Sequence, residues 1–150
     1  MNMCCIFVNR KLRRMQTINR KIKVAICDDN LPFLEGLGAF VESDERFEVV
    51  AKFSSGEELL KYNKLHSVEL LLLDVEMPGM NGVQTAKLLN FEYPRIKIIA
   101  ITMYQDKVYL TQLIESGFLG FVNKTNVSDE LFDTIEKIIS GELCFPESIN

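Results

Sequence analysis

The chain has 150 residues, which is enough for one domain with a sizeable core and too few for two domains of ordinary size. Its hydrophobic content of 47% and charged content of 25% are those of a soluble globular protein, and no apolar run approaches the ~20 residues of a membrane-spanning helix. Residues 1–23 hold seven of the 17 Lys and Arg residues and no acid, so the remainder carries ten basic and 21 acidic residues. Such an acidic body argues against nucleic-acid binding by the domain itself, because contacts to phosphates need a basic surface.

The first 20 residues form a basic extension without helical or strand periodicity. Their short apolar run, residues 4–8, precedes the basic cluster, which is the reverse of the order in a secretory signal. We expect residues 1–20 to be disordered or non-native, with Met15 as an alternative start; a tail that binds a membrane surface or nucleic acid is the other interpretation. The four cysteines make no zinc motif, and free thiols without a secretion signal indicate the cytoplasm.

Five β-type runs alternate with helical patterns along the rest of the chain. The runs that predict strands are residues 22–27, 47–53, 69–74, 96–101 and 118–122. Between them, apolar residues at helical spacing predict helices that begin at Pro32 and at a capping box in residues 55–58, and helices that span 83–91 and 108–115. Gly117 is expected to end the fourth of these helices, and Ser128 to cap a last one.

Strict alternation of strands and helices predicts an α/β fold of the (βα)5 type, a doubly wound five-stranded parallel sheet with helices on both faces. Residues 70–73 are all Leu, and such an unbroken block is typical of a central parallel strand buried on both faces. We expect one domain over residues 21–141. Residues 142–150 are then a tail, or the start of a linker to an output domain that this sequence does not contain.

Polar side chains stand at the carboxyl ends of four predicted strands: Asp28 and Asp29, Asp74, Thr102, and Lys124. In an open parallel sheet these ends lie at one edge, where ligands bind. Three crowded carboxylates stay ionised only beside a cation, and an all-oxygen set without His favours Mg²⁺. A metal-neutralised carboxylate beside a fixed ammonium can attack a phosphoryl group and form an acyl phosphate. Each residue alone has an ordinary structural interpretation, but together they predict a magnesium site that accepts a phosphoryl group.

The acid pair, the Asp in Leu-Leu-Asp-Val-Glu-Met-Pro-Gly-Met-Asn-Gly, the strand-ending Thr and the late Lys resemble the response-regulator receiver domain of two-component signalling. The resemblance covers about residues 21–141 and implies the flavodoxin-like strand order 2-1-3-4-5. Carried over by position, it makes Asp74 the phosphoryl acceptor. It also gives Asp28, Asp29 and the backbone carbonyl of Glu76 as further ligands of Mg²⁺.

The same resemblance implies a conformational switch. Lys124 would pair with the acyl phosphate, and Thr102 would move toward the phosphoryl group. Phe121 stands at the position of the switch aromatic, whose inward rotation alters the face formed by the fourth helix, the fifth strand and the fifth helix of the receiver. Phe121 lacks the hydroxyl of the commoner Tyr, and Glu76 adds a negative charge that can change the lifetime of the acyl phosphate.

Partners and chemistry follow from the resemblance as well. It implies a sensor histidine kinase as phosphodonor, homodimerisation on phosphorylation, and no enzymatic activity beyond self-catalysed phosphotransfer and autodephosphorylation. Residues 138–147 resemble the stretch that joins receivers to a helix-turn-helix domain in one subfamily of transcription factors, which implies transcription as the output.

Other classes of function stay open at this point. The domain could be a stand-alone receiver, or a pseudo-receiver that acts only through protein–protein contacts. A haloacid-dehalogenase-like phosphatase also has an Asp-x-acid motif, but after its first strand and without an upstream acid pair. Flavin binding would suit the sheet, but no phosphate-binding loop follows the first predicted strand.

Overall fold

The structure is a computed structural model that describes residues 20–146. The predictions made for residues 1–19 and 147–150 lie outside the described residues. Within the described part, five parallel strands form one sheet in the order β2-β1-β3-β4-β5, which confirms the predicted fold class and strand order. The strands are β1 (Ile22–Cys27), β2 (Phe47–Phe53), β3 (Leu70–Leu73), β4 (Lys97–Thr102) and β5 (Gly120–Asn123).

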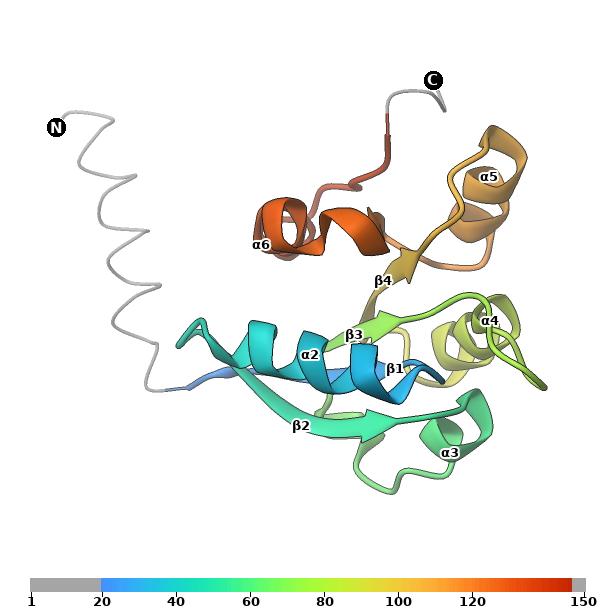
Figure 1. Ribbon diagram of the computed structural model, residues 1–150. Helices are drawn as coiled ribbons and strands as arrows, with labels where there is room; N and C mark the ends of the chain where they lie inside the picture. The colour runs from blue at the N-terminus through green and yellow to red at the C-terminus, as the bar shows by residue number, and fades with distance from the viewer. Residues whose placement is uncertain (1–19, 147–150) are drawn as a thin grey trace, which may run out of the picture.

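Helices cover both faces of this sheet (Figure 1). On one face lie α2 (Leu31–Glu42) and α6 (Val127–Ile139), and on the other lie α3 (Gly56–Leu60), α4 (Gly82–Glu92) and α5 (Lys107–Glu115). In β3, Leu70 and Leu72 pack against the first set, whereas Leu71 and Leu73 pack against the second. All four are buried, which explains the unbroken apolar block in terms of a strand with a core on each side.

The first two helices, α2 and α3, both begin with a side-chain cap, but the capping box predicted for α3 is incomplete. Asn30 caps α2 by accepting from the Phe33 N–H (3.1 Å), and Pro32 lies in the first turn. Ser55 caps α3 by accepting from the Glu58 N–H (3.1 Å). The Glu58 carboxylate accepts from the backbone N–H and hydroxyl of Ser54 instead of the Ser55 N–H, so the predicted capping box is only half formed.

Two predicted boundaries near the end of the domain are wrong. β5 begins at Gly120 rather than at residue 118, because Gly117 adopts a φ of 97° and the Phe118 N–H closes α5 by donating to the Leu113 carbonyl (3.1 Å). Ser128 does not cap α6. A short 3₁₀ turn, η2 (Lys124–Asn126), leads directly into the helix, so Ser128 lies inside its first turn.

Beyond α6 the chain returns to the edge of β5. The Phe121 N–H donates to the Cys144 carbonyl (3.0 Å), and the Cys144 N–H donates to the Leu119 carbonyl (2.9 Å). Phe145 packs, half-buried, on the core under α5. These contacts lie past residue 141, where the sequence places the end of the domain; that division stays a prediction.

A second 3₁₀ turn, η1 (Leu65–Ser67), precedes β3. None of the helices in residues 20–146 has the length and apolar character needed to cross a membrane.

Candidate functional site

The site is built on the paired ends of β1 and β3. Cys27 pairs with Leu73, and the Asp74 N–H donates to the Cys27 carbonyl (2.9 Å), so Asp28 and Asp74 leave the sheet side by side. Each of Asp28, Asp29 and Asp74 offers a carboxylate oxygen within 4.8 Å of the others. Asp28 and Asp74 are buried and Asp29 is exposed, so this edge of the sheet carries an acidic cluster that solvent reaches at Asp29.

Lys124, the residue that follows β5, reaches the same acidic cluster. Thr102 pairs with Asn123 at the ends of β4 and β5, and Lys124 is the next residue. Its Nζ lies 2.8 Å from Asp28 Oδ2 and 3.4 Å from Asp74 Oδ2, with the side chain only 18% exposed. Burial alone would lower the pKa of the Lys124 ammonium, but the two carboxylates outweigh it and raise the pKa above its ordinary value. Lys124 is therefore a fixed positive charge.

The cluster still carries surplus negative charge. Asn30 N–H donates to Asp28 Oδ1 (2.8 Å), and Asp28 Oδ2 is buried with the Lys124 ammonium 2.8 Å away. One ammonium therefore faces three carboxylates. A hard divalent cation with oxygen ligands would balance the remaining charge. The residues present therefore fit Mg²⁺.

Burial raises the pKa of two groups near the ends of β1 and β3, Asp74 and Cys27. It raises the pKa of Asp74 to about 7, with the Asp28 carboxylate adding to the effect and Lys124 and the Glu76 N–H opposing it. Burial, followed by the charges of Asp28 and Asp74, raises the pKa of the Cys27 thiol to about 12. Cys27 is thus a protonated core residue, and Asp74 is an acid whose ionised form needs a cation nearby.

Thr102 is buried at the end of β4, and its hydroxyl faces α5. Thr102 Oγ1 and the Tyr109 hydroxyl are 3.2 Å apart, and the Tyr104 N–H donates weakly to the same Oγ1 (3.4 Å). The two Tyr rings lie 5.7 Å apart. The sequence does not predict this contact, because helical spacing alone does not show which way the Tyr109 hydroxyl points.

Phe121 is also buried, with 7% exposure, among side chains of the core under α5. The structure thus brings Asp28, Asp29, Asp74 and Lys124 together and sets Phe121 in the neighbouring core. Glu76 donates its backbone N–H to Asp74 Oδ1 at 3.3 Å, and its side chain is exposed. The role of the Glu76 carbonyl stays a prediction.

A hydrogen bond and two glycines shape the loop after β3. The Met80 N–H donates to the Glu57 carboxylate (2.9 Å), and Gly79 takes a φ of 74°, which favours glycine. Gly82 approaches so closely that an added Cβ would lie 2.4 Å from the Asp74 carbonyl oxygen and 2.7 Å from Val75 Cα. The glycines of the Pro-Gly-Met-Asn-Gly segment therefore shape the backbone beside Asp74.

Comparison with known proteins decides the family. Residues 24–136 match the family described as the response regulator receiver domain. The chain belongs to this family. It is 34% identical over 129 residues to the nitrate/nitrite response regulator protein homolog of Haemophilus influenzae, which covers 86% of this chain and 62% of that protein. It is 29% identical over 126 residues to the transcriptional regulatory protein DegU of Brevibacillus brevis, which covers 84% of this chain and 53% of that protein.

A solved structure agrees with this assignment. The isolated REC domain of RcsB from Salmonella enterica serovar Typhimurium, in the presence of phosphomimetic BeF3-, superposes with a TM-score of 0.77 at 25% identity, covering 87% of this chain and 96% of that one. This chain is a receiver domain of two-component response regulators, and its relatives are regulatory proteins rather than classic enzymes. It spans a little more than half the length of the curated relatives named above.

Proposed function

We propose that this receiver accepts a phosphoryl group on Asp74 from a sensor histidine kinase in a Mg²⁺-dependent reaction. The observation that carries the proposal is the position of Lys124 Nζ, 2.8 Å and 3.4 Å from oxygens of two buried carboxylates. If Lys124 served only to form a structural ion pair, a single buried acid would be enough. A second buried acid, with a third carboxylate beside it, is costly unless the site gathers further positive charge.

The chemistry follows from this charge arrangement. The Asp74 carboxylate attacks the phosphorus of a phosphohistidine; a P–O bond forms, the P–N bond breaks, and the released imidazole takes up a proton. The product is an acyl phosphate on Asp74, with Lys124 placed to pair with a phosphoryl oxygen. Autodephosphorylation would return the carboxylate and inorganic phosphate by attack of water at phosphorus, and the charge of the exposed Glu76 side chain, two residues after Asp74, is proposed to influence that water.

Asp28, Asp29, Asp74 and the backbone carbonyl of Glu76 would hold the ion. The bound Mg²⁺ supplies positive charge that favours the ionised form of Asp74 and offsets the charge that develops on the transferring group. The grouping of three carboxylates, with oxygens within 4.8 Å of one another and a single ammonium beside them, supports this part of the proposal.

The switch is proposed to run through Thr102 and Phe121. Turning toward a phosphoryl oxygen would take the Thr102 hydroxyl away from Tyr109, and Phe121 would adjust within the core under α5. The altered face of α5, β5 and α6 would then promote homodimerisation and control an output. The name of the DegU relative describes a transcriptional regulatory protein, so we propose transcription as that output, through a DNA-binding domain outside these residues.

Mass spectrometry after incubation with phosphoramidate and Mg²⁺ tests the proposal. The wild-type chain should gain one phosphoryl group, and Asp74→Ala should gain none. Chelating Mg²⁺ should slow the transfer severely. Undiminished labelling of Asp74→Ala would refute the acceptor assignment, and metal-independent transfer would remove the role given to Asp28 and Asp29. A wild-type chain that takes no phosphate would instead favour a pseudo-receiver.

A further inference from the structure

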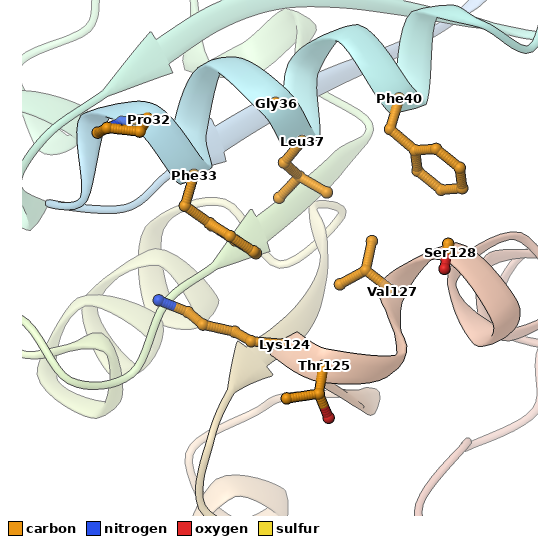
Figure 2. Close-up of a pocket in the computed structure, with 9 residues that line it drawn as sticks. All are labelled: Pro32, Phe33, Gly36, Leu37, Phe40, Lys124, Thr125, Val127 and Ser128. Carbon is orange, nitrogen blue, oxygen red and sulfur yellow. The ribbon is translucent and has the colours of Figure 1, made fainter.

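The ammonium of Lys124 lies against an aromatic ring as well as against two carboxylates. Its Nζ is 4.7 Å from the centroid of the Phe33 ring, which projects from the first turn of α2. Figure 2 shows the two side chains side by side where α2 faces the chain that follows β5. Both line a hollow of about 350 Å³. This distance is within the range of cation–π attraction, in which the negative face of the ring draws the cation.

The ring differs from the carboxylates in one respect that matters for the proposed chemistry. Asp28 and Asp74 attract Lys124 strongly, but they are also the residues proposed to hold a divalent ion, and their pull on the ammonium falls when their charge is shared. The quadrupole of Phe33 carries no net charge and is not a metal ligand. Its attraction for the ammonium therefore persists when the carboxylates are engaged.

The Phe33 ring also limits where the Lys124 side chain can move. The hollow beside the two residues is lined on the α2 side by Phe33, Leu37 and Phe40 and on the other side by the residues that follow Lys124. A lysine released from the acids has open space there. With the ring in place, the ammonium lies 4.7 Å from the ring centroid and 3.4 Å from Asp74 Oδ2.

We propose that Phe33 is a positioning residue for phosphoryl transfer, which holds the Lys124 ammonium beside Asp74 through a cation–π contact. This inference rests on the proposed function of Asp74. Phe33 touches neither the acceptor oxygen nor the donor, so it acts only through Lys124.

Progressive fluorination of the ring at position 33 separates this role from simple packing. Fluorine atoms weaken the negative face of the ring while its shape changes little and its hydrophobicity rises. We expect the rate of phosphorylation by phosphoramidate at saturating Mg²⁺ to fall stepwise from Phe33 to 4-fluoro- and 3,4,5-trifluorophenylalanine, to a total of about fivefold. A purely apolar role predicts an unchanged or higher rate, and that result would overturn the inference.

Phe40 provides the matched control. It lies on the same helix and lines the same hollow, but its ring stacks on Phe132 with centroids 4.9 Å apart. Fluorination at position 40 should leave the rate unchanged; an equal loss there would also overturn the inference, since it would point to a general effect on α2.

A second measurement does not depend on phosphorylation. In the unphosphorylated protein, NMR should place the Lys124 Hε protons upfield because of the Phe33 ring current, and Phe33→Leu should abolish that shift. A Lys124 signal at its ordinary position in the wild-type chain would refute the contact itself. If the wild-type chain takes no phosphate, the proposed function fails and this inference with it; if it is labelled but the fluorine series is flat, only this inference fails.

Discussion

Replacing Asp74 with Asn should make the metal-free protein more stable above pH 7. Burial and the Asp28 carboxylate raise the pKa of Asp74 from 3.8 to about 7, so at higher pH the folded chain must hold a charge that its surroundings disfavour. An Asn of the same shape removes that charge. We therefore predict that the Asp74 side chain lowers the free energy of unfolding in the absence of metal, as expected of a residue retained for function.

The size and the sign of the effect follow from proton linkage. One pKa unit corresponds to about 1.4 kcal/mol, so the rise from 3.8 to about 7 corresponds to about 4 kcal/mol. Below pH 4 both states are protonated and the penalty is absent. Between pH 4 and 7 the unfolded state ionises first, so the wild-type chain loses stability as the pH rises, and above pH 7 the penalty is constant. The pKa of about 7 already includes the opposing attraction of Lys124, so we expect a net gain of about 2–4 kcal/mol for Asp74→Asn at pH 8.

Urea unfolding in the presence of a chelator, at pH 5, 6, 7 and 8, measures this gain. The midpoint should rise for Asp74→Asn at pH 8 without a change in m, and the gain should shrink steadily toward pH 5. Asp133→Asn is the control, because Asp133 is exposed on α6 and should change stability by less than about 0.5 kcal/mol. Equal stability of wild type and Asp74→Asn at pH 8, or a gain that does not depend on pH, would refute the reasoning.

Three further substitutions test the surroundings of the site. Gly82→Ala should cost about 2 kcal/mol in urea unfolding, since its Cβ would meet the Asp74 backbone, whereas Gly36→Ala has nothing within 4 Å and should be neutral or stabilising; equal effects would contradict this. Tyr109→Phe removes a hydrogen bond to Thr102 worth about 1 kcal/mol, so Thr102 can turn toward the phosphoryl site more easily. The half-saturating beryllofluoride concentration in an NMR titration should fall about fivefold, and an unchanged value would argue that this hydrogen bond does not hold Thr102 in place. Lys124→Ala in saturating Mg²⁺ should accept phosphate yet show no phosphorylation-dependent change in sedimentation; wild-type behaviour would exclude its switch role.

The main features of the fold could be predicted from the sequence because they depend on local periodicity and on topology. The alternation of strands and helices allows few arrangements, and the all-Leu block of β3 indicates burial on both faces. The strand-end polar residues were expected to converge for the same reason: parallel strands bring their carboxyl ends to one edge. The convergence of Asp28, Asp74 and Lys124 could therefore be predicted from their positions after the first, third and fifth strands.

The details that were missed depend on tertiary contacts that periodicity does not carry. Ser128 is a residue type that often caps helices, but the η2 turn, which begins at Lys124, determines where α6 begins. The direction of the Tyr109 hydroxyl is set by packing between α5 and β4. The approach of Phe33 to Lys124 joins residues 91 positions apart in the chain, and no spacing rule relates them.

Chemical mapping of the phosphorylated residue tests the central claim most directly. Borohydride reduces an aspartyl phosphate to homoserine, and peptide mass spectrometry of the chain treated with phosphoramidate and Mg²⁺ then locates the modified position. The account predicts homoserine at position 74 and unmodified aspartate at positions 28 and 29. Homoserine at either of those positions, or none anywhere in a chain that has gained a phosphoryl group, would contradict it.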